Sequence, residues 1–342
     1  MADQEVVMLV GYPASGKSTI ANQFIEQGYV HINRDTHGGK TVSGVPLMVE
    51  AINAGKSVIL DNTFVSEEKR KAFIDASTVP IRCMVMSTTI EQAQFNAARR
   101  MVQTYGKILS PEEIKKTKSP NCFPAAVLFQ YRKAYEKPTM AEGFASLESV
   151  PFEFNLGPEY KNEAIIFDAD DTLRVSVGPD KWPTKPEHVQ LLPGRREKFD
   201  ALGHHSRQNL PDDGMYLLGV SNQSAIAKGE LTEDDARACF NRTNELLDVD
   251  IEWHFCPHRV PPISCFCRKP MPGLGAYFVE KYKLDPAKVI MVGDQTSDKT
   301  FAARCGFQFQ YATEFFNEKE TGTKKKAKGA KRTAKKKKAK GK

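Results

Sequence analysis

An eight-residue run near the start of the chain, GYPASGKS, has glycine, lysine and serine at a spacing that can hold a polyphosphate. Gly11 and Gly16 permit backbone conformations closed to other residues, so that loop N–H groups can point at phosphate oxygens. Lys17 can bridge β- and γ-phosphates, and Ser18 can place its hydroxyl on Mg²⁺. A glycine-rich turn could match by chance, but the flanking strand and helix patterns favour an ATP-binding loop. The nucleotide-binding residues expected here are Gly11, Ser15, Gly16, Lys17, Ser18 and Thr19.

Two acidic residues follow the next apolar runs. Asp35 ends the run HINRD, and Asp61 begins the run DNT. A carboxylate near a γ-phosphate can accept the proton of an attacking hydroxyl, which is the role we expect for Asp35. Asp61 could orient the acceptor or support the metal. Each acid could instead be an ordinary turn or N-cap residue, and the nearby phosphate-binding loop is what favours function.

Three arginines are candidates for closing over the phosphates. Arg99 and Arg100 end a predicted amphipathic helix, and Arg132 lies in a later one. An arginine that reaches the phosphates would stabilise the charge of the transition state. The alternative for each is a solvated helix face.

A second acidic run, FDADDTL, ends another predicted buried strand. Asp168 and Asp170 stand two residues apart, so one can attack phosphorus while the other protonates the leaving oxygen. Mg²⁺ between a carboxylate and the phosphate would offset their repulsion. A solvated acidic turn is the alternative.

Three later motifs argue against that alternative. The run VSNQ offers the Ser221 hydroxyl and the Asn222 amide to a phosphate, and RKP places Lys269 as a fixed positive charge. The run GDQTSD supplies Asp294 and Asp298 as metal carboxylates. The expected Mg²⁺ ligands are Asp168, Asp170, Asp294 and Asp298.

A cysteine-rich loop lies inside this second region. Cys256, His258, Cys265 and Cys267 fall within twelve positions around several prolines. Three thiols and one imidazole can close a tetrahedron around Zn²⁺, and with all four positions filled the metal would be structural. Reduced core cysteines beside a turn are the alternative.

The elements that must position these groups alternate between strands and helices. Apolar runs at 6–10, 29–32, 58–60 and 81–86 read as strands, with helices such as 66–76 and 90–102 between them. The pattern restarts with strands at 164–167, 216–220 and 289–292. We therefore expect an α/β fold with two parallel-sheet domains, whose ligands bind at the carboxyl edges of the strands. Residues 147–160 read as a linker packed against both halves.

Composition and charge narrow the class of protein. The 342 residues are 40% hydrophobic and 27% charged, which supports folded domains and excludes wholesale disorder. No apolar run reaches the roughly 18 residues that span a membrane, and no signal peptide is evident. The seven cysteines are odd in number and lie far apart, except Cys256, Cys265 and Cys267, which favours a reducing intracellular compartment. We expect no membrane partner.

The net charge of +7 belongs to one segment. Residues 324–342 hold twelve Lys/Arg and no acid, and the rest of the chain has 37 basic against 42 acidic residues, a balance of −5. We expect a disordered lysine-rich tail over residues 321–342, which binds a polyanion in a salt-dependent way. It could also act as a nuclear import signal in a eukaryote, or only as a solubilising tail.

Residues 1–155 resemble the kinase domain of the polynucleotide 5′-hydroxyl kinases, especially that of polynucleotide kinase/phosphatases. The resemblance rests on GYPASGKST, GYVHINRDT, GKSVILDNT, TTIEQAQFNAARR and YRKAYEKPTMAEGFASLESVPFEF. It implies a P-loop kinase fold, ATP as donor, and Asp35 as general base. It also implies phosphate and metal roles for Lys17, Ser18 and Asp61. The family's lid arginine matches Arg99 or Arg100.

Residues from roughly 163 to 312 resemble the haloacid dehalogenase phosphatases, which implies a phosphatase domain over residues 156–320 with a capless Rossmann-like fold. The nucleophile of that family matches Asp168, its acid/base Asp170, and its metal acids Asp294 and Asp298. Asp171 stands where the family usually has glycine. The pattern C-x-H…C-x-C-R-K-P resembles the zinc loop of histidinol-phosphate and heptose-bisphosphate phosphatases.

Together these resemblances imply a bifunctional enzyme of strand-break repair. It would phosphorylate 5′-hydroxyl ends with ATP and hydrolyse 3′-phosphate ends through an aspartyl-phosphate. DNA or RNA ends would be its partners, and we expect a monomer; a ligase or other repair protein is not encoded in any motif. Two alternatives stay open: a kinase/phosphatase for small metabolites, and a nucleic-acid-binding protein with inactive sites.

Overall fold

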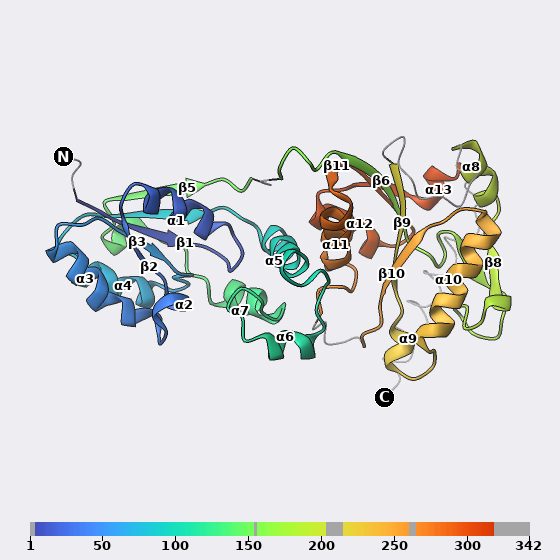
Figure 1. Cartoon of the computed structure of the whole chain (residues 1–342), viewed down its shortest axis with the longest axis horizontal. Helices are drawn as coiled ribbons and strands as arrows, with labels where there is room; N and C mark the ends of the chain where they lie inside the picture. The colour runs from blue at the N-terminus through green and yellow to red at the C-terminus, as the bar shows by residue number, and fades with distance from the viewer. Residues whose placement is uncertain (1–3, 154–155, 203–214, 260–264, 318–342) are drawn as a thin grey trace, which may run out of the picture.

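The computed structural model describes residues 4–153, 156–202, 215–259 and 265–317 (Figure 1). Within these residues the chain forms two parallel sheets with helices on both sides, as the alternating pattern predicts. The lysine-rich segment expected over 321–342 lies outside the described residues, as do 154–155 of the expected linker. No helix in the described part of the chain is long and apolar enough to cross a membrane.

The first sheet has five parallel strands in the order β2-β3-β1-β4-β5. All five side chains of β1 are fully buried, because helices cover both faces of a parallel sheet. The strands are β1 (Val6–Val10), β2 (Val30–Ile32), β3 (Val58–Asp61), β4 (Ile81–Met86) and β5 (Ser146–Val150).

The helices of the first domain connect these strands. They are α1 (Lys17–Glu26), α2 (Arg34–His37), α3 (Val45–Asn53), α4 (Glu67–Ala76), α5 (Ile90–Tyr105), α6 (Pro111–Thr117) and α7 (Ala126–Ala134), with 3₁₀ turns at Thr41–Gly44 and Met140–Glu142. Helix α5 is the best specified, because a capping box between Thr89 and Gln92 begins it and Gly106 ends it in a left-handed conformation.

The expected linker over residues 147–160 is wrong in its first part. Residues up to Val150 belong to β5, which pairs in parallel with β4 at the edge of the sheet. An edge strand needs few apolar residues, and the sequence SLESV therefore reads as a loop.

The second sheet also has five parallel strands, in the order β10-β9-β6-β11-β12. They are β6 (Asn162–Phe167), β9 (Met215–Asn222), β10 (Glu252–Cys256), β11 (Leu284–Gly293) and β12 (Gln308–Tyr311). A small antiparallel pair, β7 (Arg174–Ser176) and β8 (Val189–Leu191), is the only insertion between β6 and α8 among the described residues, so no large cap domain covers this sheet there.

The helices of the second domain flank this sheet. They are α8 (Arg195–Ala201), α9 (Ser224–Ala227), α10 (Glu233–Leu247), α11 (Gly273–Tyr282), α12 (Thr296–Cys305) and α13 (Ala312–Phe315), with a 3₁₀ turn at Pro186–His188. Helix α5 of the first domain packs against α11 and α12 (Figure 1). One hydrophobic cluster therefore contains Met101 of α5 together with Phe278 and Phe301 of the second domain.

Candidate active sites

The phosphate-binding loop leaves the buried strand β1 and enters α1 through a strained turn. Gly16 has φ 93° and Ala14 has φ 62°, both in the left-handed region that favours glycine. A Cβ atom on Gly11 would lie 2.8 Å from the Met86 Cβ, so only glycine fits where this loop crosses β4. The loop is therefore held in one conformation by its own backbone and by β4.

Lys17 is buried at the start of α1. Its Nζ donates to the Gly11 carbonyl at 3.1 Å and to the Tyr12 carbonyl at 2.6 Å. Burial lowers the pKa of Lys17 to about 8, although the neighbouring Asp61 raises it. The ammonium group is thus short of negative partners, which favours a bound anion.

Asp61 ends β3 beside this loop and is 3% exposed. Its Oδ2 accepts the Ser18 hydroxyl at 3.0 Å and the Asn33 amide at 3.1 Å. Burial would raise the pKa of Asp61, but hydrogen bonding to His31 and the charge of Lys17 lower it. An ionised carboxylate therefore lies next to the Ser18 hydroxyl, and this oxygen pair fits Mg²⁺.

Two clefts flank the loop. The larger, of about 400 Å³, lies between α1, α5 and the end of β5, and Ser15 and Thr19 line it. The smaller, of about 270 Å³, holds Lys17, Asp61 and Asp35. Asp35 lies in the first turn of α2, where the Asn33 side chain caps its N–H at 2.7 Å, and its side chain is 39% exposed. A carboxylate open to solvent thus lies across the smaller cleft from the loop.

The structure separates the three candidate arginines. Arg100 lines both clefts, and it lies close enough to Lys17 to lower the pKa of that ammonium group. Arg99 lines only the larger cleft, and its guanidinium forms an ion pair with Glu280 of the second domain at 2.5 Å. Arg132 is exposed on α7, where it packs over the Phe129 ring. Only Arg100 of these three lies between the two clefts.

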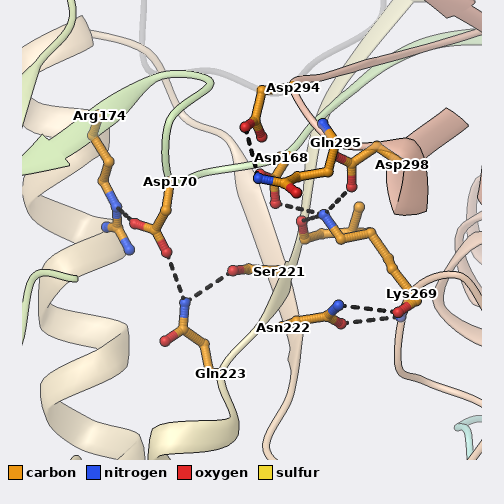
Figure 2. A network of polar contacts seen from close by, with 11 residues as sticks. Asp168, Asp170, Arg174, Ser221, Asn222, Gln223, Lys269, Asp294, Gln295 and Asp298 are labelled. Atoms are coloured by element: carbon orange, nitrogen blue, oxygen red, sulfur yellow. Dashed lines mark hydrogen bonds and ion pairs between the residues drawn. The ribbon is translucent and has the colours of Figure 1, made fainter. Parts of the chain in front are cut away.

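The second site lies at the carboxyl edge of the second sheet, where Asp168 follows β6 (Figure 2). The Lys269 ammonium donates to Asp168 Oδ1 at 2.5 Å and to the Val220 carbonyl at 2.9 Å. It also pairs with Asp298 at 2.8 Å, and the side chains of both Lys269 and Asp298 are at most 2% exposed. A cavity of about 340 Å³ opens onto these groups.

Asp168, Asp294 and Asp298 form a group whose carboxylate oxygens lie within 4.8 Å of one another. The buried Asp294 Oδ1 has no hydrogen-bond partner in the described part of the chain, although it lies in a polar site. Three hard oxygen donors with an unsatisfied atom among them fit Mg²⁺. The carboxylate of Asp170, which we expected as a fourth ligand, is not part of this group.

The Asp170 carboxylate is held outside this group by two residues that the sequence motifs did not identify. Arg174 donates to one oxygen of Asp170 at 2.9 Å, and Gln223 donates to the other at 3.2 Å (Figure 2). Gln223 also donates to the Ser221 hydroxyl at 2.9 Å. Arg174 stands only four positions after Asp170, so the two are close in sequence, whereas the contact of Gln223 with Asp170 depends on the fold.

The backbone of this site is held in a defined conformation at two places. Asp171 has φ 62°, so the aspartate that replaces the usual glycine does make the left-handed turn. Asn222 donates to the Lys269 carbonyl at 3.1 Å and accepts the Lys269 N–H at 3.0 Å. Asn222 therefore fixes the backbone that carries Lys269, a role beyond the phosphate contact expected from sequence.

Burial sets the protonation of this site. Burial raises the pKa of Asp168 well above its usual range, although the Lys269 charge lowers it. Burial acts against the charge of Lys269, but Asp168 and Asp298 raise its pKa. The carboxylates of Asp168 and Asp298 thus favour the charged form of Lys269 despite its burial.

The cysteine-rich loop brings its four predicted ligands together. One atom of each of Cys256, His258, Cys265 and Cys267 lies within 4.8 Å of the others. His258 Nδ1 is 3.4 Å from the Cys256 sulfur and 3.2 Å from the Cys267 sulfur. This donor set is one that Zn²⁺ prefers, and it immediately precedes Lys269 in the chain.

Comparisons with known proteins agree with this division of the chain. Residues 6–137 match a family model described as an AAA domain, and residues 266–331 match one described as HAD-hydrolase-like. A bifunctional polynucleotide phosphatase/kinase of Schizosaccharomyces pombe is 34% identical over 154 residues, which cover 44% of this chain and 34% of that protein. The chain thus spans about a third of that relative.

The chain is also similar to a curated phosphatase and to a chain of a solved complex. A D-glycero-beta-D-manno-heptose-1,7-bisphosphate 7-phosphatase of Haemophilus influenzae is 31% identical over 150 residues, or 40% of this chain and 73% of that protein. Among solved structures, a chain of the Pnkp1/Rnl/Hen1 RNA repair complex is 17% identical and covers 90% of this chain and 95% of that chain, with a TM-score of 0.29.

Proposed function

The chain belongs to the HAD-hydrolase-like phosphatases in its second half and carries an AAA-type P-loop domain in its first, and from this premise we propose that it heals nucleic-acid ends. One domain phosphorylates 5′-hydroxyl ends with ATP, and the other hydrolyses 3′-phosphate ends. One observation carries the proposal. The same chain contains a phosphate-binding loop beside a cleft that can hold the acceptor, and also an aspartate site suited to a phosphomonoester. A strand break with a 5′-hydroxyl end and a 3′-phosphate end is the substrate that needs both phosphorylation and hydrolysis.

In the kinase domain, Lys17 and the loop N–H groups hold the nucleotide phosphates. Asp35 accepts the proton of the 5′-hydroxyl, whose oxygen then attacks the γ-phosphorus as the bond to ADP breaks. Arg100, between the two clefts, stabilises the charge on the transferred group. Mg²⁺ on Ser18 and Asp61 would neutralise phosphate charge when bound.

In the phosphatase domain, the Asp168 carboxylate attacks the 3′-phosphate, and Asp170 gives its proton to the leaving 3′-oxygen. Water then attacks the aspartyl-phosphate, with Asp170 taking the proton back, and releases inorganic phosphate. Lys269 balances the charge of the nucleophile and the phosphate. Mg²⁺ on Asp168, Asp294 and Asp298 would reduce the repulsion between carboxylate and phosphate when bound.

The test is direct. The full chain is incubated with ATP and an oligonucleotide that carries a 5′-hydroxyl and a 3′-phosphate, as DNA and as RNA in parallel. We expect a phosphate to appear at the 5′ end and to leave the 3′ end. If neither end changes with either nucleic acid, the proposal fails.

A second candidate function has its own support. The heptose-bisphosphate phosphatase of Haemophilus influenzae shares 73% of its length with this chain, so a small sugar phosphate is a reasonable phosphatase substrate. In the same assay, turnover of heptose 1,7-bisphosphate exceeding that of the oligonucleotide at equal concentration would favour this candidate.

The cysteine-rich loop holds structural Zn²⁺ in this proposal. All four donors are protein groups, so the metal would brace the backbone that leads to Lys269 rather than bind substrate. Replacing Cys267 with serine should remove about one equivalent of zinc, measured by atomic emission, and should lower the phosphatase rate. ATP turnover serves as the control, because the kinase site lies in the other domain. Equal zinc in both proteins would contradict the assignment.

A further inference from the structure

The contact between the two domains includes a charged pair beside the kinase site. Arg99 of α5 and Glu280 of α11 meet at 2.5 Å, with side chains 12% and 5% exposed. The second oxygen of Glu280 accepts the Tyr160 hydroxyl at 2.7 Å, and Lys283 lies 3.7 Å from the same carboxylate. Glu280 is therefore fully engaged at this contact, and its partner Arg99 is the residue next to Arg100 in the chain.

The same helix also contacts the phosphate-binding loop. Asn96 donates its side-chain amide to the Ala14 carbonyl at 3.2 Å, and Arg100 follows one helical turn later at the two clefts. Arg99 projects from the same turn as Arg100, but its guanidinium points to the second domain. A rotation or shift of α5 would therefore move both arginines together.

Many of the other contacts of α5 with the second domain are apolar. Ala97 and Met101 share a buried cluster with Leu274 and Phe278 of α11 and with Phe301 of α12. Apolar burial is not directional and tolerates small rotations of a helix, whereas a hydrogen-bonded ion pair has a required geometry. The hydrogen-bonded pair between Arg99 and Glu280 is thus a directional contact with the second domain that constrains the rotation of α5.

We propose that Glu280, a residue of the phosphatase domain, is a positioning residue for the kinase reaction. Through Arg99 it holds α5 so that Arg100 stays beside the phosphate-binding loop. The inference rests on the proposed kinase function and extends it, because the kinase site then depends on a side chain of the other domain. The phosphatase reaction does not depend on this pair, since none of its residues contacts Arg99.

The first test compares Glu280→Gln with the wild-type chain. Glutamine keeps the size of the side chain but removes the charge that holds Arg99. We expect kcat for 5′ phosphorylation to fall about tenfold, because small displacements of a catalytic group are costly. The KM for ATP should change less than threefold, and release of 3′-phosphate should stay within twofold of the wild type.

Two further variants separate positioning from general damage. Lys281 lies on the same helix as Glu280, but its ion-pair partner, Glu252 of β10, belongs to the second domain. Lys281→Gln should therefore leave kinase kcat unchanged. The charge swap of Arg99→Glu with Glu280→Arg restores an opposite pair at this contact. It should recover at least a third of the kinase kcat lost in Glu280→Gln.

The outcomes distinguish this inference from the proposed function. If the wild type phosphorylates 5′ ends and Glu280→Gln does so equally fast, the positioning role is wrong while the function stands. A parallel fall of kinase and phosphatase rates, or an equal loss in Lys281→Gln, would also overturn it by indicating general destabilisation. A wild type that phosphorylates no 5′ end contradicts the proposed function itself.

Discussion

The two phosphate sites differ in how their charged groups are held. In the phosphatase site Lys269 is fixed by Asp168, Asp298 and the Val220 carbonyl, and Asn222 fixes its backbone. In the kinase site the Lys17 ammonium binds only backbone carbonyls, and Asp35 is 39% exposed on a helix of four residues. The lysine of the first site is thus paired with two carboxylates before substrate arrives, whereas Lys17 forms no ion pair among the described residues.

The difference follows from where the nucleophile resides. A phosphatase that uses Asp168 must orient a carboxylate of its own, and a buried carboxylate needs a charged partner to stay ionised. A kinase receives both its nucleophile and its phosphoryl group from substrates, so its cations must be free for them. Four substitutions test this contrast between the two sites.

The largest effect is expected for Asp168→Asn. The amide cannot attack phosphorus, so release of 3′-phosphate should fall about 10⁴-fold or more, followed with malachite green on a 3′-phosphate oligonucleotide. Kinase activity of the same protein should stay within twofold of the wild type. Loss of both activities in a folded protein would mean that the two sites are not independent.

Asp35→Asn is the matched change in the kinase site. Removing a general base should slow 5′ phosphorylation by about 10²–10⁴-fold, measured with γ-labelled ATP. Because Asp35 is exposed, and its ion pair with Arg34 at 3.3 Å is exposed as well, its loss should leave the melting temperature and the phosphatase rate unchanged. A destabilised protein would show that Asp35 is as tightly integrated as Asp168, contrary to the comparison.

Arg100→Lys tests the group between the two clefts. Lysine keeps the charge but loses the planar fork, so kinase kcat should fall about 10- to 100-fold. The same substitution at Arg132, which is exposed on α7, should change kcat less than twofold. Equal effects at both positions would argue against Arg100 as the arginine that acts on the phosphates.

The smallest effect concerns the stability of the phosphatase half away from its site. Burial would raise the pKa of Glu252, but hydrogen bonds from His254, Lys281 and Tyr282 lower it to about 2. A carboxyl with a lowered pKa stabilises the fold above about pH 4.5 and loses that contribution as the pH falls toward 2. Glu252→Gln should therefore cost about 1–2 kcal/mol at pH 7 and less at pH 3.

Urea unfolding followed by tryptophan fluorescence measures this cost, because both tryptophans, Trp182 and Trp253, lie in the second half. Glu163→Gln is the control, since its ion pair with Lys288 is half exposed and should contribute less than about 0.5 kcal/mol. A pH-independent difference between wild type and Glu252→Gln would contradict the charge-based explanation.

Much of the fold could be predicted from the sequence because buried parallel strands form short, nearly continuous apolar runs. The runs Val6–Val10 and Ile81–Met86 coincide with β1 and β4, because strands inside a helix-covered parallel sheet are apolar at most of their positions. The edge strand β5 was missed and assigned to a linker, because a strand with few buried side chains carries no such pattern. A continuous hydrophobic run indicates a buried strand, and a strand at the edge of a sheet buries too few side chains to have such a run.

Short-range patterns in the sequence are enough to predict the candidate residues for phosphate and metal binding. The glycines and Lys17 of the loop, the pair Asp168 and Asp170, and the Cys/His group are all short-range patterns, and their spacing alone predicts phosphate and metal chemistry. The structure brings these groups to the carboxyl edges of two parallel sheets, as that spacing requires.

Only the tertiary structure decided how each group is oriented. Arg99 and Arg100 are adjacent and identical in type, and only the packing of α5 between two domains turns one to Glu280 and the other to the clefts. Similarly, Gln223 is distant in sequence from Asp170 yet binds it at 3.2 Å. Such assignments depend on contacts between segments far apart in the chain, which no local pattern encodes.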